Sequence, residues 1–181
     1  YLYGNPLASI DLSSNDLLVE VDLSGTEITT LEVSHLSLLE DLRLEGAKKL
    51  TSLDVSQNEL LYILYASANG LEEGDPAPED RGSLTQVLLP KGGELSDVTL
   101  DYHLLESIDL SGMTNSSLNV YLRGNKLKSV DFTGVTGSDF FLDLSLNVLD
   151  SIDLSEITGV NAVVNLNENP LKKATLGCVY E

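Results

Sequence analysis

The chain has 181 residues, with 29 Asp and Glu against 10 Lys and Arg, so its formal net charge is −19. This excess of negative charge repels phosphate backbones and anionic lipid head groups, which argues against general binding to nucleic acids or membrane surfaces. Apolar residues make up 42% of the chain, which is too much for a disordered acidic tail and is enough for one folded domain with a buried core.

Short apolar triplets recur along the chain from its first residues. An Asn-type motif, in which an apolar-x-apolar triplet is followed by a turn and usually by Asn, covers residues 2–7, 21–28, 42–47 and 64–71. An Asp-type motif, with Asp or Glu in the middle of the triplet, alternates with it at 10–13, 31–34 and 53–56. The period of two within each triplet predicts short strands rather than helices, and the Gly, Asn, Ser and Thr that follow supply turns.

One segment departs from this rhythm. Leu42 and Leu64 are 22 residues apart, whereas Leu64 and Val98 are 34 residues apart. The excess includes residues 72–83, an acidic stretch rich in Pro and Gly. We expect a solvated surface loop there, with a functional loop and a tolerated insertion as the two alternatives.

The second half of the chain repeats without such irregularity. Its Asp-type segments start at Leu105, Leu127, Leu149 and Leu171, and its Asn-type triplets start at Val120, Leu142 and Val164, so both motifs step by 22 residues. A fixed period of this length indicates a solenoid, in which each coil buries its apolar side against its neighbours. We expect about eight coils of 21–22 residues, with parallel strands stacked at about 4.8 Å.

The Asn-type motif, for example Val120-Tyr-Leu-Arg-Gly-Asn-Lys-Leu127, resembles the consensus L-x-x-L-x-L-x-x-N-x-L of the leucine-rich repeat family. The likeness covers nearly all of residues 1–181. With its Asp-type half-repeats, the chain resembles exported surface proteins of Bacteroidetes-type bacteria and, more loosely, internalin-like adhesins. The resemblance implies a single, mainly β solenoid domain with little or no helix, parallel strands on a concave face, short extended segments on a convex face, and an extracellular or cell-surface location.

The resemblance also implies a ladder of inward-facing Asn side chains that bond the backbone of adjacent coils. Its members here would be Asn5, Asn69, Asn125, Asn147 and Asn169. Turn amides inside a solenoid have no strand partner and need one. Thr26, Ala47 and His103 occupy the same slot, so we expect the ladder to be interrupted there. Asn15 and Asn58 occupy the matching slot of the Asp-type half. In the first coils the sequence therefore does not decide which of the two halves forms the concave wall.

Side chains that point outward from the Asn-type strands would form columns along the concave face. Most are polar, but Tyr, Phe and Arg, which anchor many protein interfaces, are interspersed. We therefore predict a recognition patch of Arg43, Ile63, Tyr65, Tyr121, Arg123 and Phe141. The alternative is that these residue types merely suit exposed strands.

The Asp-type halves place a column of acids on the opposite wall: Asp11, Glu32, Asp54, Asp109, Asp131 and Asp153. Carboxylates about 4.8 Å apart would repel each other by roughly 0.9 kcal/mol in water. Splaying into solvent or screening by Ca²⁺ would relieve this repulsion. A compact calcium loop of the D-x-[DN]-x-[DN]-G type is absent, so no metal site is predicted.

Catalytic motifs are also absent. The chain has two histidines, His35 and His103, and a single cysteine, Cys178, which cannot form an internal disulfide. It contains no G-x-S-x-G, H-E-x-x-H, G-x-G-x-x-G or P-loop motif. We expect a protein that is not an enzyme and needs no cofactor.

The predicted function is a binding module whose concave face holds a basic protein partner. A carbohydrate-binding surface and a structural spacer are the alternatives. Salt should weaken binding to a basic protein but hardly affect binding to a neutral sugar.

The two ends suggest a longer parent protein. Because Tyr1 begins inside a repeat, we expect a cap or further domain upstream of it, or else pairing of this exposed edge between chains. Residues 172–181 look like a decayed last repeat. No apolar run approaches the roughly 18–20 residues that a membrane-spanning helix needs, so we expect no direct membrane insertion.

Overall fold

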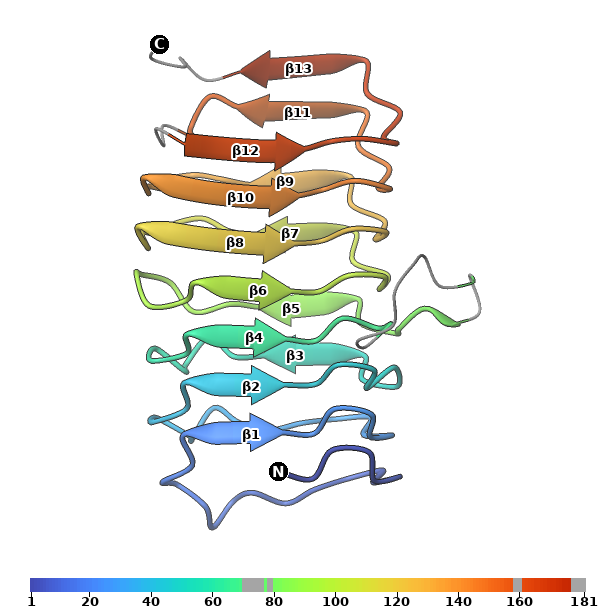
Figure 1. Ribbon diagram of the computed structural model, residues 1–181, viewed down its shortest axis with the longest axis vertical. Helices are drawn as coiled ribbons and strands as arrows, with labels where there is room; N and C mark the ends of the chain where they lie inside the picture. Colours follow the sequence, from blue (N-terminus) through green and yellow to red (C-terminus); the bar gives the residue numbers. More distant parts are fainter. Residues whose placement is uncertain (70–76, 78–79, 158–160, 177–181) are drawn as a thin grey trace.

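The computed structural model of the protein describes residues 1–69, 77, 80–157 and 161–176. Within these ranges the chain forms thirteen short β-strands and no α-helix. The strands stack one coil above another along a single long axis (Figure 1). The prediction of a mainly β solenoid with little or no helix is confirmed.

Seven strands form one parallel sheet, which we call the front wall because it faces the viewer in Figure 1. They are β1 (Glu20–Asp22), β2 (Asp41–Arg43), β4 (Ile63–Tyr65), β6 (Asp97–Thr99), β8 (Ser117–Tyr121), β10 (Asp139–Asp143) and β12 (Asn161–Asn165). The N-terminal turn continues the stack below β1 without forming a strand: the amides of Leu2 and Gly4 donate to the carbonyls of Asp22 and Ser24 at 2.8 and 2.7 Å. Counting that turn, the described front wall has eight levels, which agrees with the expected number of about eight coils.

The opposite side, which we call the back wall, carries the Asp-type triplets. Its strands are β3 (Ser52–Asp54), β5 (Gln86–Leu88), β7 (Ser107–Asp109), β9 (Ser129–Asp131), β11 (Ser151–Leu154) and β13 (Lys173–Leu176). They pair as three two-stranded parallel sheets, β3–β5, β7–β9 and β11–β13. The back wall is thus more regular than isolated extended segments, although the first two Asp-type segments, 10–13 and 31–34, form no strand.

The register of the front wall follows the 22-residue period. Val120 pairs with Leu142, which pairs with Val164. Leu64 pairs with Val98 despite the longer separation, so the extra residues are accommodated outside the sheet. Most of the predicted loop at 72–83 lies outside the described residues. Where the described chain resumes, the amide of Gly82 donates to the carbonyl of Tyr102 at 2.9 Å.

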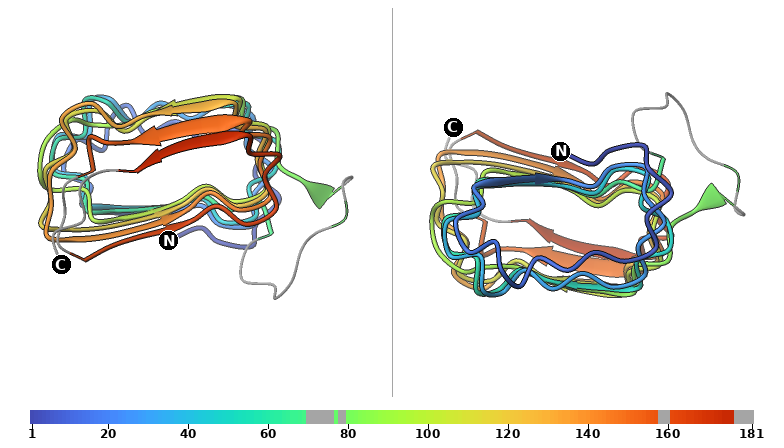
Figure 2. Two further views of the ribbon diagram at one scale, coloured as in Figure 1. Left: turned by 90° about the horizontal axis from the view of Figure 1, so that it is seen from above. Right: turned by 90° about the horizontal axis from the view of Figure 1, so that it is seen from below.

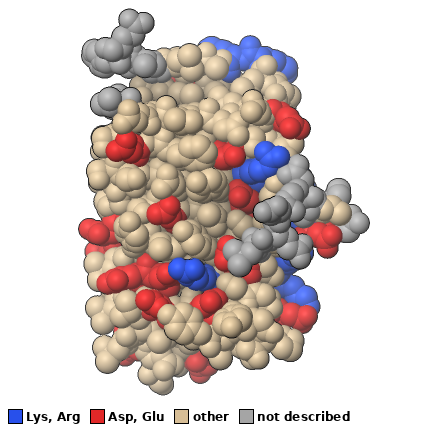
Figure 3. Space-filling model, in the orientation of Figure 1, with Lys and Arg blue, Asp and Glu red and all other residues tan. Residues whose placement is uncertain are grey.

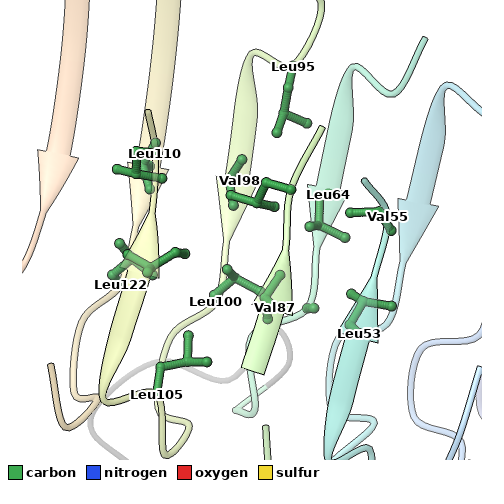
Figure 4. Packing of buried hydrophobic residues seen from close by; sticks show 14 of the residues in the cluster. Leu53, Val55, Leu64, Val87, Leu95, Val98, Leu100, Leu105, Leu110 and Leu122 are labelled. Atoms are coloured by element: carbon green, nitrogen blue, oxygen red, sulfur yellow. The ribbon is translucent and has the colours of Figure 1, made fainter. Parts of the chain in front are cut away.

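The two walls enclose a continuous apolar core. Leu64 and Val98 point inward from the front wall and meet Leu53 and Val87 from the back wall (Figure 4). Full burial of such a side chain contributes about 1.5–3 kcal/mol, and each of these side chains packs against neighbouring coils. Seen along the stack axis, successive coils lie almost on top of one another (Figure 2). The front wall, which corresponds to the predicted concave face, is therefore nearly flat.

A left-handed turn follows the front-wall strands. Gly4, Gly25, Gly46 and Gly124 have φ between 66° and 71° there. Tyr102, Leu146 and Glu168 occupy the same turn in other coils with φ of 61°, 55° and 58°. Glycine adopts this conformation without the penalty that a Cβ atom incurs.

Gly124 also packs against a side chain of the coil below, and its replacement should be costly. A Cβ atom added to Gly124 would lie 2.4 Å from Cδ1 of Tyr102. We expect Gly124→Ala to lower the free energy of unfolding by about 2 kcal/mol, as measured by urea denaturation. Gly4→Ala is the matched control, because Gly4 has φ of 68° but no atom within 4 Å of an added Cβ. Equal losses in the two variants would contradict a packing role for Gly124.

Candidate functional site

The front wall presents two parallel columns of outward side chains. Cα pairing places Asp22, Arg43, Tyr65, Thr99, Tyr121, Asp143 and Asn165 in one column. The second column contains Glu20, Asp41, Ile63, Asp97, Asn119, Phe141 and Val163. Alternate residues of each strand point inward, so the short strands fix which side chains face the solvent. The structure thus aligns the residues that the repeat pattern places in these columns.

The lower half of the front wall holds a cluster around Arg43. The Arg43 guanidinium lies 5.3 Å from the ring centroid of Tyr65, and its Nη2 donates to Oδ2 of Asp41 at 2.8 Å. A second bond from Nε to Oδ1 of Asp41, at 3.0 Å, makes the ion pair bidentate. The hydrogen bonds to Asp41 raise the pKa of Arg43, so the guanidinium stays charged. Ile63 precedes Tyr65 by two residues on β4 and shares its outward face.

The upper half holds a second, more apolar cluster. The rings of Tyr121 and Phe141 lie with centroids 5.2 Å apart at an interplanar angle of 41°. Phe141 pairs in register with Val163, whose side chain is exposed. Next to this pair, Nδ2 of Asn119 donates to Oδ1 of Asp97 at 3.0 Å. The arrangement offers an aromatic surface with a hydrogen-bonded polar pair at its border.

The predicted patch is therefore divided. β6 lies between β4 and β8 in the sheet, so Asp97 and Thr99 separate the Arg43–Tyr65 cluster from the Tyr121–Phe141 cluster. At about 4.8 Å per strand, β4 and β8 are roughly 10 Å apart. A partner that touches both clusters must cross this acidic strip.

Arg123, the sixth residue of the predicted patch, lies beyond the ends of the strands and bonds to neighbouring coils. Its Nε donates to the Tyr102 hydroxyl at 2.7 Å, and its Nη1 donates to Oγ of Ser145 at 2.8 Å. Its backbone amide donates to Oδ1 of Asp101 at 2.7 Å. Burial raises the pKa of Asp101 to about 7, against the opposing influence of the Arg123 amide. Arg123 thus contributes to the packing of coils, a role that the sequence pattern does not reveal.

The front wall is strongly acidic. Its seven strands carry six acids, Glu20, Asp22, Asp41, Asp97, Asp139 and Asp143, and one cation, Arg43. Figure 3 shows this face, with acidic side chains gathered on the left of its lower half around a basic group near its centre. A shallow hollow of about 180 Å³ beside Arg43 is lined by Tyr1, Glu20, Val21, Asp22 and Asp41. A ligand that displaces water from this face must supply positive charge or hydrogen-bond donors.

The Asn residues of the upper coils form regular inward hydrogen bonds. Nδ2 of Asn125 donates to the carbonyls of Leu100 and Leu122 at 2.8 and 3.1 Å, and its Oδ1 accepts from the amide of Leu105 at 3.2 Å. Asn147 and Asn169 repeat these bonds one and two coils higher.

The first members of the proposed ladder occupy different surroundings. Asn5 is exposed and donates to Leu2 and Tyr3 within its own turn, at 3.0 and 3.3 Å. Asn69 is half-buried in the turn that precedes the long loop. In the lower coils the buried Asn58 of the Asp-type half forms comparable inward bonds, donating to the carbonyls of Val33 and Leu36 at 2.8 and 3.0 Å.

The expectation that His103 interrupts this series is wrong. Its Nε2 lies 2.6 Å from the carbonyl oxygen of Ala66, and its Nδ1 accepts from the amide of Leu84 at 3.4 Å. The ring is 1% exposed, and burial lowers the pKa of His103 to about 4, so the neutral ring takes the place of an Asn side chain. Thr26 bonds only within its own coil, donating to Leu23 at 2.6 Å. Ala47 has no polar side-chain atom to offer.

The acids of the back wall accept hydrogen bonds from the turns that follow them. The carboxylates of Asp11, Glu32, Asp54, Asp109, Asp131 and Asp153 each accept a hydrogen bond from the amide of the Ser or Thr two residues later, at 2.8–2.9 Å. Hydrogen bonds from that Ser or Thr lower the pKa of every one of these carboxyls. The recurring Ser or Thr is the signal by which the sequence could have revealed this role.

A metal site on the back wall gains no support. Asp109, whose pKa falls to about 2, also pairs with Lys91 at 2.9 Å. In the part of the chain that the structure describes, no group of three or more His, Cys, Asp or Glu side chains is arranged to hold a metal ion.

The other chemically reactive residues have structural surroundings or lie outside the described part. Nε2 of His35 lies 3.0 Å from the carbonyl oxygen of Leu12, which ties the second coil to the first. Cys178 falls outside the described residues. Among residues 1–69, 77, 80–157 and 161–176, no helix is long and apolar enough to cross a membrane.

Comparisons with known proteins do not identify a family. No protein-family model and no curated protein matches the chain. A solved structure described as "Functional domain of InlJ from Listeria monocytogenes includes a cysteine ladder" is 16% identical, and the match covers 91% of this chain and 56% of that chain. This chain therefore spans little more than half the length of that structure. The TM-score of 0.26 is too low to support an argument, so the function must be inferred from the front wall itself.

Proposed function

We propose that the front wall is a protein-recognition surface for a basic partner. The observation that carries this proposal is the register of the seven-stranded sheet, which places two aromatic clusters on one face among six acids. Aromatic and Arg side chains commonly supply most of the binding energy of an interface, and complementary charge accelerates association.

The two clusters suggest how the partner is held. An apolar side chain of the partner would rest against Tyr121, Phe141 and Val163, where the structure exposes an apolar surface. A Lys or Arg side chain about 10 Å away would approach the acids near Tyr65, with Asp97 lying between the two contacts. The partner segment would then cross the parallel strands along the stack axis.

A random peptide library selected on the immobilised protein tests this proposal. We expect enrichment of peptides that combine Lys or Arg with aromatic or aliphatic residues. Tyr121→Ala/Phe141→Ala should weaken the selected peptides at least tenfold, and raising the salt concentration should weaken them further. Leu88→Ala is the matched control, because Leu88 is an exposed apolar residue on the back wall. Equal binding by wild type and the double variant would contradict the proposal.

Neutral carbohydrate is the second candidate ligand. The hydrogen-bonded Asn119–Asp97 pair lies beside the Tyr121 ring, and a sugar needs both polar partners and an aromatic surface. An oligosaccharide array probed with wild-type protein distinguishes the two candidates, because binding of a neutral sugar should be nearly independent of salt. A pure spacer would bind neither probe.

The remaining features of the proposal rest on the repeat pattern and its resemblance to leucine-rich repeat proteins. In this proposal the protein is not an enzyme and resides at a cell surface. The engagement of His103 in coil packing supports the first point, since a buried neutral ring is poorly placed to act as a base. Labelling of intact cells with an antibody against the chain would test the second.

A further inference from the structure

A column of exposed leucines runs along one edge of the solenoid, apart from the front wall. Leu17, Leu38 and Leu60 lie three residues before the paired positions Glu20, Asp41 and Ile63, so they repeat in three successive coils. Their side chains are 81%, 40% and 43% exposed. Val19 and Tyr62, 39% and 50% exposed, extend the same edge. We call these five residues the leucine edge.

Backbone hydrogen bonds hold the leucine edge in register. The amide of Glu40 donates to the carbonyl of Val19 at 2.8 Å, and the amide of Tyr62 donates to the carbonyl of Glu40 at 2.8 Å. These bonds stack the three turns directly beside β1, β2 and β4, at the left of Figure 1. The exposed side chains are therefore supported by a fixed backbone.

The three coils that follow do not share this apolar character. At the corresponding place in the next coils, three residues before Asp97, Asn119 and Phe141, the chain has Glu94, Ser116 and Ser138, all exposed. Water-facing turns normally carry such polar residues. The lower three coils thus differ from the next three, which indicates a specific surface rather than a requirement of the fold.

The surroundings of the leucine edge are acidic. Asp16 and Glu59 immediately precede Leu17 and Leu60, and Glu40 lies between Val19 and Tyr62. The three turns, residues 14–20, 35–41 and 57–63, contain no Lys or Arg. Figure 3 shows acidic side chains and no basic ones along this lower left edge. A partner that covers the leucines must therefore bring apolar residues flanked by positive charge.

The spacing of the leucines selects the conformation of the partner. Successive coils are about 4.8 Å apart, and an apolar seam repeating every 3.5 residues along an α-helix advances about 5.2 Å per contact. Residues on one face of a strand advance roughly 6.6–6.8 Å, which falls out of step by the third contact. We propose that the leucine edge binds a basic amphipathic α-helix, which lies along the stack axis and sets successive apolar residues against Leu17, Leu38 and Leu60.

Synthetic peptides test this site independently of any natural partner. The probe is a fluorescently labelled 18-residue peptide of Leu and Lys in which the leucines share one helical face. The first control peptide has the same composition in an order that scatters the leucines, and the second replaces Lys by Glu. We expect fluorescence anisotropy to show binding of the first peptide and at least tenfold weaker binding of both controls.

Variants of the protein locate the binding. Leu17→Ser/Leu38→Ser/Leu60→Ser should weaken binding of the basic helix at least tenfold. Leu88→Ser, which alters a back-wall leucine as exposed as Leu60, should not weaken it. Circular dichroism checks that the triple variant remains folded. Equal binding of the ordered and scattered peptides would overturn the proposal.

Two further outcomes would also overturn it. The first is loss of binding in Tyr121→Ala/Phe141→Ala with retention in the triple variant, which would place the helix on the front wall. The second is concentration-dependent association of the wild type, abolished in the triple variant, without peptide binding. That result would assign the leucine edge to a second copy of the chain.

Discussion

Asn147→Ala should lower the free energy of unfolding by about 3–4 kcal/mol, which is the largest loss of stability that we expect. The buried side chain donates to the carbonyls of Leu122 and Leu144 at 2.9 and 3.0 Å and accepts from the amide of Leu127 at 3.0 Å. Alanine leaves these backbone groups inside the solenoid without their side-chain partner. Each buried polar group that loses its partner costs about 1–3 kcal/mol, so the three groups together account for the expected loss.

The same substitution at the exposed end of the stack provides the control for Asn147. Asn5 occupies the equivalent place in the N-terminal turn but bonds only within that turn, where water can replace it. We expect Asn5→Ala to cost less than about 1 kcal/mol in urea denaturation followed by circular dichroism. Similar losses in the two variants would mean that the inward hydrogen bonds of Asn147 do not hold adjacent coils together.

Asp101→Asn should raise the free energy of unfolding by about 2–4 kcal/mol at pH 8 and leave it almost unchanged at pH 4. Burial raises the pKa of Asp101 from 3.8 to about 7 in the folded chain. Below pH 3.8 the carboxyl is protonated in both states. As the pH rises from 3.8 to 7 only the unfolded state ionises freely, so the wild type loses stability over this range. The substituted side-chain amide would keep an acceptor for the Arg123 backbone amide, which Asp101 binds at 2.7 Å, without the buried charge.

His103 gives the opposite pH dependence, so the stability of the Asp101→Asn variant should change with pH in a defined direction. Burial lowers the pKa of His103 from 6.5 to about 4, so its contribution to stability is present above pH 6.5 and is lost as the pH falls toward 4. In the wild type this trend and that of Asp101 oppose each other. Asp101→Asn removes one of them, so the stability of the variant should rise between pH 4 and pH 7.

Thermal melts at several pH values measure both the gain and this slope. Asp16→Asn serves as a control, because Asp16 is exposed and its replacement should change stability by less than about 0.5 kcal/mol. A gain in Asp101→Asn that is equal at pH 4 and pH 8 would contradict a buried carboxyl at position 101.

The repeat allows much of the front wall to be predicted. A fixed spacing of 22 residues and a period of two within each triplet determine both the strand partners and the outward side chains. This is why Tyr121 and Phe141, 20 residues apart in the sequence, could be placed in neighbouring columns. In the structure the centroids of their rings are 5.2 Å apart.

Other features depend on side-chain contacts that periodicity does not encode. Arg123 has the residue type of an interface anchor, but Tyr102 occupies the turn where four other coils have Gly. The Tyr102 hydroxyl accepts a hydrogen bond from the Arg123 side chain. His103 occupies an Asn position, yet a neutral ring also has one nitrogen to donate and one to accept. The nearly flat front wall is not encoded in the period of the repeat either; it becomes visible only when the coils are seen along the stack axis (Figure 2).

The most direct test of the proposed function is to determine which wall of the solenoid binds a basic peptide. A basic peptide selected on the wild-type protein can be titrated into isotopically labelled protein, and the backbone amide shifts can be followed by NMR. We expect the largest changes around Arg43 and Tyr65 and around Tyr121 and Phe141, on both sides of β6. Changes confined to the back-wall strands β3, β5, β7, β9, β11 and β13 would contradict it.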